Sequence, residues 1–385
     1  MSHASYLHVV LALAVAGILS FATTPLAKKF AFLVDAVDRP HGRHMHEKPT
    51  ALMGGLAIFF GFLVALLSFG SMDRQMTSIL LGALIIIIMS ALDDIFDLPA
   101  WLRLLVQIAA ASIPVFYGGI RIDVLSTFGI GTDPDIVLDE MISIPVTLIW
   151  IVGITNAVNW IDGLDGLAAG VSGISAVSLL VIACILGNAY VAVTMAALAG
   201  AILGFLPYNR NPAKIFMGDT GAMFLGFVLA TMSIQGLFKF YLVVGYLVPF
   251  LVIGIPLLDM LVAITRRLSQ GQSPMASDRE HMHYKLIDLG FNQKQTVAIL
   301  YCVSGIFGIA AIVLTAGGEI KGILLLLAIL VAAIFGVRLI ALRERKQEDP
   351  SDESGDAEEP VPQNEDAAAG EKSADTAKDT ERENR

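Results

Sequence analysis

The 385-residue chain has little cysteine and little charge. Its two cysteines, Cys184 and Cys302, lie far apart in apolar runs, which argues against a disulfide framework and against a sulfur-ligated metal site. Only 16% of the residues are charged and 56% are hydrophobic, a composition too apolar for a soluble domain of this length. The composition therefore predicts an all-α polytopic membrane protein.

The net charge of −10 arises in one segment of the chain. Residues 347–385 hold 14 acidic and 4 basic residues, and the rest of the chain holds 21 of each sign. This segment is rich in Glu, Asp, Ala, Ser and Pro and has almost nothing to bury. We therefore expect a transmembrane domain over 1–345 and an acidic, disordered cytoplasmic tail over 346–385.

Long apolar runs predict about eleven transmembrane helices. A bilayer core of about 30 Å requires roughly 20 apolar residues in a helix. The runs that meet this requirement span 5–26, 51–70, 77–96, 100–118, 142–160, 164–186, 189–207, 220–236, 240–265, 295–316 and 320–341. The first run has no A-x-A-like cleavage site, so we interpret it as a retained helix and not as a signal peptide.

Lys and Arg are distributed unevenly between the connections. One set of connections holds 17 of them, and the other holds only Arg74, Arg121, Lys239 and Lys321. Because cations in short loops favour the cytoplasmic side, we expect the N-terminus outside and the C-terminus in the cytoplasm. The unusual polar motifs all fall on the cationic side, whereas the external segment 119–141 shows the alternation of a short hairpin.

The segment NAVNWIDGLDGLAAG, residues 156–170, is polar although long apolar runs flank it. Asn159, Asp162 and Asp165 are spaced by three and would line one strip of a helix. Ionisable groups at membrane depth are costly and are candidates for function. A connecting turn whose aspartates cap the next helix is the alternative interpretation.

The segment MSALDDIFDLPAWLRLL, residues 89–105, ends the third predicted helix with three acids. The spacing of Asp97 from Asp93 and Asp94 places it on the same helix face as both, so we expect the carboxylates to crowd together. Such a cluster requires a divalent cation or a cationic partner nearby, and crowding leaves one carboxylate able to accept a proton. Capping of the following helix is the alternative.

A third motif, YNRNPAKIFMGDTGAMFLG, spans residues 208–226. Asp219 precedes the eighth predicted helix, and Gly218 and Gly221 permit the backbone to turn tightly into that helix. Free amides at a helix N-terminus suit a phosphate group, although a simple N-cap would have the same pattern.

Two cytoplasmic loops are rich in cations and histidine. RRLSQGQSPMASDREHMHYKLIDLG, residues 266–290, carries Arg279, His281 and His283, which suit phosphate better than zinc. The first loop, DAVDRPHGRHMHEKPTALMGG, residues 35–55, is also basic. A solvated loop or a contact with anionic lipid is the alternative for these segments, and Asp259 is a weaker site candidate.

Four motifs, which are ALDDIFD, NAVNWIDGLDGLAAG, IFMGDTG and DREHMHYKL in chain order, carry a family resemblance. The chain resembles the polyprenyl-phosphate N-acetylhexosamine-1-phosphate transferases over about residues 1–345, which would be the catalytic domain. The resemblance implies transfer of a sugar 1-phosphate from a UDP-sugar to undecaprenyl phosphate, with release of UMP. It also implies a multi-pass protein of the bacterial inner membrane with its active site facing the cytoplasm.

The resemblance also implies residue roles. Asp93, Asp94 and Asp219 would be catalytic, the first two at the lipid phosphate and the third on Mg²⁺, or Mn²⁺, with help from Asn159. The expected substrate contacts are Phe216 on the uracil with Asp165 and Asn209, Asp162 and Lys48 beside the nucleotide, and Arg279, His281 and His283 at the pyrophosphate or sugar. A homodimer is left open, and no nucleic-acid partner is implied.

Two further segments favour one branch of the family. The KPTALMGG and DREHMH segments resemble the N-acetylglucosamine-1-phosphate transferases of O-antigen and teichoic-acid pathways more than the phospho-muramoyl-pentapeptide transferases, which remain the alternative. The family loop usually reads H-x-H-H, whereas Tyr284 stands at the last position here.

The residue types suit this chemistry. Oxygen ligands favour a hard cation, and bringing two anionic phosphates together makes charge neutralisation and positioning the main demands. Direct attack and a covalent aspartyl-phosphate route both remain open. DDIFD also resembles the DDxxD element of membrane prenyltransferases, but those enzymes pair two such motifs. A transporter would place its polar groups near the middle of helices, often in inverted repeats.

Overall fold

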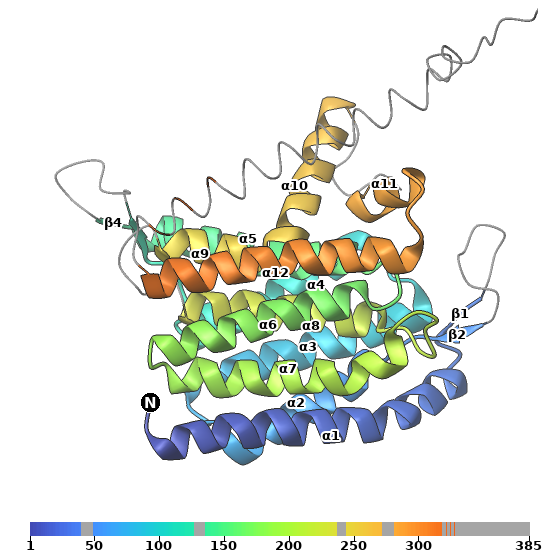
Figure 1. The fold of residues 1–385 in the computed structure, drawn as a ribbon, viewed down its shortest axis with the longest axis horizontal. Helices are drawn as coiled ribbons and strands as arrows, with labels where there is room; N and C mark the ends of the chain where they lie inside the picture. The colour runs from blue at the N-terminus through green and yellow to red at the C-terminus, as the bar shows by residue number, and fades with distance from the viewer. Residues whose placement is uncertain are drawn as a thin grey trace, which may run out of the picture. The chain divides into compact units, whose positions relative to one another are not determined.

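The computed structural model describes residues 1–39, 49–126, 135–236, 244–271 and 281–317, together with residues 321, 324 and 327. All of these residues belong to one compact unit, Met1–Ala328. Its long helices lie side by side (Figure 1). The tail expected over 346–385 lies outside the described residues, so its proposed disorder stays a prediction.

Helices form nearly all of the regular structure in this part of the chain. Their bounds are α1 His3–Leu33, α2 Gly55–Phe69, α3 Arg74–Phe96, α4 Ala100–Ser112, α5 Glu140–Trp160, α6 Leu167–Ile185, α7 Ala189–Asn209, α8 Gly218–Gly236, α9 Val244–Val252, α10 Gly254–Ser269, α11 Met282–Asp288 and α12 Gln293–Gly317. A π-helical turn, η1, extends α4 over Ile113–Tyr117.

The predicted all-α, multi-pass membrane class is confirmed. Seven helical segments among the described residues are long and apolar enough to cross a membrane. The first ten predicted spans coincide with helical elements, whereas most of the eleventh, 320–341, lies outside the described residues. The total of eleven helices and the orientation of the chain therefore stay predictions.

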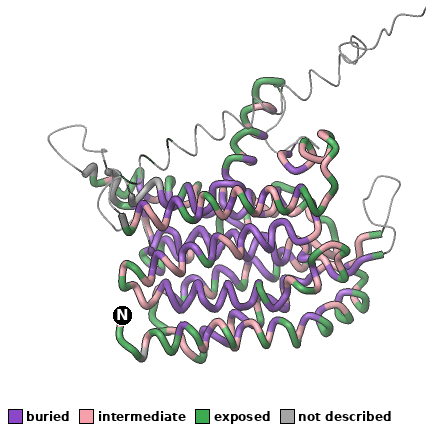
Figure 2. The backbone as a smooth tube through the Cα atoms, viewed as in Figure 1, coloured by how far each residue is buried: buried purple, intermediate pink, exposed green. Residues whose placement is uncertain are grey.

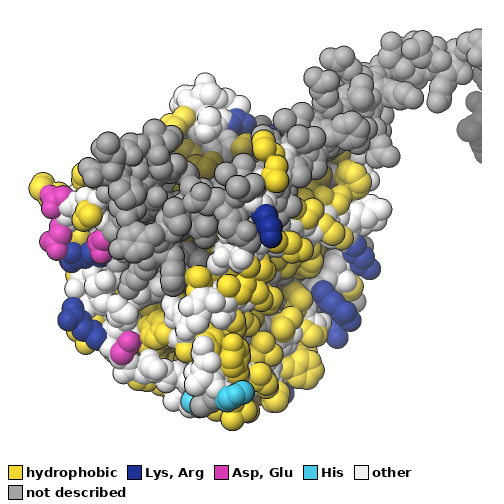
Figure 3. All heavy atoms as spheres, turned by 60° about the vertical axis from the view of Figure 1, so that its left-hand side comes forward, with side chains coloured by type: hydrophobic (Ala, Val, Ile, Leu, Met, Phe, Trp, Pro, Cys, Tyr) yellow, Lys and Arg dark blue, Asp and Glu magenta, His cyan; other side chains and the backbone are white. Residues whose placement is uncertain are grey.

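Small residues let the central helices approach one another closely. α1 packs against α7, where a Cβ added at Gly200 or Gly204 would overlap the α1 backbone. Buried positions gather on α6, α7 and α8 in the middle of the bundle (Figure 2). By contrast, large apolar side chains such as Ile88 and Leu105 are exposed. Figure 3 shows a broad hydrophobic surface, as expected for a protein that faces lipid.

Two short hairpins join helices. β3 (Val124–Ser126) pairs antiparallel with β4 (Asp135–Val137), which confirms the hairpin predicted for 119–141. β1 (Val37–Asp38) pairs with β2 (Thr50–Ala51) in the first loop. The N-terminus and β4 lie at one end of the bundle, and β1, β2 and α11 lie at the other (Figure 1).

The β2 segment positions the start of α8. The Phe216 amide donates to the Ala51 carbonyl at 2.9 Å, and the Gly54 amide donates to the Phe216 carbonyl at 3.0 Å. A Cβ at Gly55 would overlap the backbone of Gly221, so the close approach requires glycine there. The loop before α8 is therefore fixed by main-chain contacts with a segment far away in the sequence.

The ninth predicted span differs from the prediction because it is broken. We expected one helix over 240–265, whereas α9 ends at Val252 and α10 begins at Gly254. Pro256 has no N–H to donate to the Val252 carbonyl, which instead accepts a 2.6 Å hydrogen bond from Ser175 Oγ on α6. The break lets α10 leave the bundle at an angle, toward α11 (Figure 1).

Candidate active site

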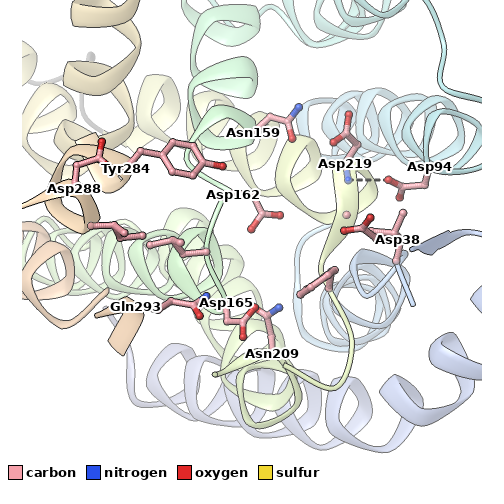
Figure 4. Close-up of a pocket in the computed structure, with 16 residues that line it drawn as sticks. Asp38, Asp94, Asn159, Asp162, Asp165, Asn209, Asp219, Tyr284, Asp288 and Gln293 are labelled. Carbon is pink, nitrogen blue, oxygen red and sulfur yellow. Dashed lines mark hydrogen bonds between the residues drawn. The ribbon is translucent and has the colours of Figure 1, made fainter. Parts of the chain in front are cut away.

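One end of the bundle contains a polar cavity of about 670 Å³. It lies where the ends of α3, α5, α7 and α12 meet β1, the start of α8 and α11. Its lining is Asp38, Leu52, Asp94, Asn159, Asp162, Gly163, Leu164, Asp165, Asn209, Phe216, Gly218, Asp219, Tyr284, Ile287, Asp288 and Gln293 (Figure 4). Six of the predicted site residues besides Asp94 therefore share one cavity: Asn159, Asp162, Asp165, Asn209, Phe216 and Asp219.

The segment between α5 and α6 is a turn, not a continuous helix. α5 ends at Trp160, and α6 begins after Gly166, whose φ of 79° lies in the left-handed region that favours glycine. Asp162 stands near the middle of the labelled side chains in Figure 4. Burial, followed by the charges of Asp94 and Asp165, raises the pKa of Asp162 to about 7.

Asp165 has a structural task besides lining the cavity. Its Oδ2 accepts hydrogen bonds of 3.0 Å from the Asn211 side chain and from the Ala213 amide. These bonds hold the loop after α7 against the turn after α5. Asn209, at the end of α7, donates to the Ile215 carbonyl at 3.1 Å, while its buried Oδ1 has no hydrogen-bond partner. An amide acceptor therefore remains unsatisfied beside Phe216 in the cavity wall.

Arg103 joins two of the predicted catalytic acids. Its Nη1 donates to Asp93 Oδ2 at 2.8 Å and to Asp219 Oδ2 at 3.2 Å. Asp93 also accepts from the Leu98 amide at 2.7 Å, and it is buried and does not line the cavity. The structure therefore does not place Asp93 with Asp94 and Asp219 at the cavity wall. Asp93 instead holds Arg103 beside Asp219.

Asp94 binds the N-terminus of α8. It accepts from the amides of Asp219 and Thr220 at 3.0 and 3.2 Å, and from Thr220 Oγ1 at 2.5 Å. A carboxylate at this position stabilises the positive end of the helix dipole. We expected these amides to be free for a phosphate, but here Asp94 occupies them, and this carboxylate lies in the cavity wall (Figure 4).

Asp97 does not crowd against the other two acids of its motif. α3 ends at Phe96, and Asp97 adopts a φ of 49° as the residue that terminates the helix. Its side chain is exposed and lies outside the cavity lining. The expectation of three carboxylates on one helix face was therefore wrong, because the helix ends one residue before the third.

The two histidines lie behind the cavity wall and not in it. His281 Nδ1 is 2.7 Å from Asp259 Oδ2, and His283 is only 1% exposed. Burial lowers the pKa of His283 to about 4, so its ring is neutral near pH 7. Lys48 and Arg279, the predicted cations of the site, lie outside the described residues.

Several lining residues were not predicted from the sequence. Asp38 comes from β1, Tyr284 and Asp288 come from α11, and Gln293 comes from the start of α12. Tyr284 points into the cavity from the side opposite Asp94 (Figure 4). Tyr284 and Asp288 are spaced by four, the spacing of one helix face, and this signal could have found them. From the sequence, Arg103 counts only as one of the 17 Lys and Arg in the cationic connections.

The donor set of the cavity fits a hard divalent cation. Six aspartates line it, and no Lys, Arg or His is among its described lining residues. Within the described part of the chain, no three His, Cys, Asp or Glu side chains lie close enough together to hold a metal by themselves. Mg²⁺ commonly binds through one or two carboxylates plus substrate phosphates and water, so Asp219 with Asn159 is a sufficient protein contribution.

The sequence matches a known family model and several named proteins. The family model "Glycosyl transferase family 4" matches residues 76–237. A probable undecaprenyl-phosphate N-acetylglucosaminyl 1-phosphate transferase of Bacillus subtilis is 37% identical over 298 residues, which cover 76% of this chain and 80% of that protein. A decaprenyl-phosphate N-acetylglucosaminephosphotransferase of Mycolicibacterium smegmatis is 34% identical over 353 residues, with 83% and 86% covered. The motifs, the helical bundle and these relatives agree, and the chain belongs to glycosyl transferase family 4.

Proposed function

We propose that the protein transfers N-acetylglucosamine 1-phosphate from its UDP-sugar to undecaprenyl phosphate. An oxygen of the lipid phosphate attacks the β-phosphorus of the UDP-sugar, and the bond from that phosphorus to the oxygen of UMP breaks. The products are undecaprenyl-diphosphate-N-acetylglucosamine and UMP. The relatives from Bacillus subtilis and Mycolicibacterium smegmatis are named for polyprenyl-phosphate N-acetylglucosamine transfer, which favours this substrate over a muramoyl-pentapeptide.

The observation that carries the proposal is the cavity at one end of a membrane helix bundle. It combines a base-sized aromatic side chain, Phe216, with the acids Asp94, Asp162 and Asp219 in one continuous wall. A lipid phosphate and a water-soluble nucleotide sugar can meet only at such a boundary. The prenyltransferase alternative loses support because Asp97, the last acid of its motif, is exposed outside the cavity.

Mg²⁺ is the proposed cofactor, with Mn²⁺ as a substitute. When bound, it would neutralise the phosphate charge that builds up between donor and acceptor. Asp219 and Asn159 would hold it, and Arg103 keeps one oxygen of Asp219 directed by a 3.2 Å ion pair. The acidic lining supports this proposal because two anionic substrates would otherwise be repelled from the cavity.

The remaining side chains have proposed tasks that follow from their places. Phe216 would stack on the uracil, and the unpartnered Oδ1 of Asn209 supplies an acceptor beside it. Asp94 would face the lipid phosphate, where its bonds to α8 fix its orientation. For Lys48 and Arg279, which lie outside the described residues, the family resemblance alone supports roles beside the nucleotide and at the pyrophosphate or sugar.

The cavity is proposed to face the cytoplasm of a bacterial inner membrane, since UDP-sugars are made there. The excess of Lys and Arg in the connections that carry the polar motifs supports this orientation. A homodimer remains compatible with the proposal.

The test uses detergent-purified full-length protein with undecaprenyl phosphate and radiolabelled UDP-N-acetylglucosamine, with Mg²⁺ or with a chelator. We expect UMP and a labelled lipid product only with the metal, and no such product with UDP-muramoyl-pentapeptide. The Asp219→Asn variant should lose turnover while it still folds. A near-normal rate in that variant would remove Asp219 from the metal site, and transfer of the pentapeptide substrate alone would overturn the proposed donor.

A further inference from the structure

A buried pair, Asp259 and His281, ties α10 to the start of α11. His281 Nδ1 lies 2.7 Å from Asp259 Oδ2, and the Met282 amide donates to Asp259 Oδ1 at 2.8 Å. Both side chains are buried, at 4% and 8% exposure. Each oxygen of Asp259 is therefore engaged by the first residues of the α11 segment. The position of α11 depends on a carboxylate 22 residues earlier in the chain.

The ring of His283 lies beside this pair. The His281 and His283 rings are parallel, with an interplanar angle of 2° and centroids 5.8 Å apart. The amides of Tyr284 and Lys285 donate to the His281 carbonyl, so the first turn of α11 begins at the anchored residue. His283 Nε2 is buried and has no hydrogen-bond partner. Burial keeps the pKa of this ring at about 4, so at neutral pH it has no net charge with which to attract an anion.

His283 packs directly on the turn that carries the cavity acids. A Cβ added at Gly163 would overlap Nε2 of His283 and would lie 2.9 Å from Cε1. Gly163 does not have a positive φ, so its backbone does not require glycine. The close contact with the imidazole is what leaves no room for a side chain.

The second half of the turn has its own supports, because Asp165 accepts from Asn211 and the Ala213 amide, and the Gly166 carbonyl accepts from Tyr301 Oη. Asp162 donates its amide to the Asn159 carbonyl at 3.1 Å, and Leu167 donates to the Leu164 carbonyl at 3.0 Å. Trp160, just before the turn, contacts the same cluster through His281 and through the Arg267 guanidinium, which lies 4.8 Å from its ring. The histidine cluster is therefore the packing surface against which the first half of the turn, at Gly163, rests.

We propose that Asp259 is a positioning residue, which acts through His281 and His283 to hold the Gly163 turn at its place in the cavity. The histidines then contribute to transfer by packing behind the wall, and not by touching the pyrophosphate or sugar. The proposal rests on the proposed function only because Asp162 of that turn and Asn159, at the end of α5 just before it, are the groups it would align.

The decisive experiment is a double-mutant cycle between Gly163→Ala and His283→Ser. Gly163→Ala should lower kcat/KM by about 100-fold, because a displacement of about 1 Å in a reacting site has this effect. His283→Ser makes room for the new methyl group. We therefore expect the double variant to recover at least about 10-fold over Gly163→Ala alone.

A packing role and a substrate-contact role for His283 predict opposite results in this double-mutant cycle. If His283 instead contacts the substrate, the two losses should multiply, and that outcome would overturn the proposal. Gly153→Ala is the matched control on α5, because its Cβ would meet only the Met260 methyl at 3.8 Å. This control should keep normal activity.

Asp259→Asn tests the anchor. It keeps the side-chain volume but removes the charge opposite His281, and we expect kcat/KM to fall by about 10- to 100-fold with a raised KM for the UDP-sugar. In this background His283→Ser should cost much less than in the wild type, because the ring is no longer held. Independent effects of Asp259→Asn and His283→Ser on kcat/KM would contradict the proposed action of Asp259 through His283. Asp123→Asn, which loses a carboxylate bonded to Ser143 at the other end of the bundle, is the control.

Thermal unfolding separates this proposal from the proposed function. If the wild-type protein transfers no sugar phosphate, the proposed function fails, but the packing contact can still be measured. Gly163→Ala should lower Tm, and added His283→Ser should restore part of the loss. An additive loss of Tm would overturn the contact whether or not the protein is active.

Discussion

Asp93 and Asp219 share a single nitrogen of Arg103, although they lie on α3 and α8. Asp93 is buried with a 3% exposed side chain, and Asp219 reaches the cavity wall. The arrangement makes one guanidinium the link between the end of α3 and the residue proposed to bind the metal. Removing the link should affect both stability and turnover.

Arg103→Met is expected to lower the free energy of unfolding by about 1–3 kcal/mol, because it leaves the buried Asp93 carboxylate with fewer donors. It should also lower kcat strongly, since Asp219 loses its 3.2 Å partner. Thermal unfolding in detergent and the transfer assay measure the two effects. Arg103→Lys keeps the charge and should recover part of both, whereas equal losses in the two variants would argue against a charge effect.

Thr220 provides a second test, at the contact between α3 and α8. Thr220→Val removes the hydroxyl that donates to Asp94 Oδ2 at 2.5 Å and keeps the side-chain shape. A lost hydrogen bond to a charged group costs about 1.5–3 kcal/mol, so Tm should fall. Thr220→Ser keeps the hydroxyl and should remain close to the wild type. A valine variant as stable as the serine variant would show that Asp94 does not depend on this bond.

His283 should make the folded state less stable in mild acid. Its folded-state pKa is about 4, below the usual 6.5, so the unfolded chain binds more protons between these values. The His283 contribution is complete above pH 6.5 and is lost as pH falls toward 4, by up to about 1.4 kcal/mol per pH unit. His283→Gln should remove this dependence in Tm measured from pH 7 to pH 4.5, and an unchanged slope would refute the shift.

Asp162 should reduce stability as pH rises, which is the opposite of the effect of His283, over almost the same pH range. Its folded-state pKa is raised to about 7, so the folded protein binds more protons than the unfolded chain between about pH 4 and pH 7. This group therefore reduces stability as pH rises through that window. Asp162→Asn should make Tm rise more steeply with pH than in the wild type, when measured without metal or nucleotide. A shallower rise would show that Asp162 is ionised in the folded state.

The lining of the cavity was largely predictable from polar residues in an apolar chain. Asp94, Asn159, Asp162 and Asp219 stood out because polarity at membrane depth is costly without a function. The polar hairpin 119–141 was also found correctly, since alternation of side chains is a local signal. By contrast, the end of α3 before Asp97 and the break before Gly254 were missed, although Pro99 and Pro256 are local signals for both.

The sequence by itself determined the membrane class of this protein, the approximate positions of its helices and the polar motifs that belong to its site. These features follow from local hydropathy and spacing, which need no knowledge of neighbours. Only the tertiary structure decided which acid faces the cavity, which acid pairs with Arg103, and that His283 lies behind Gly163. Most of these choices depend on contacts between segments more than 100 residues apart, such as those of Asp219 with Arg103 and with Asp94, where side-chain packing selects one partner among several of the same chemistry.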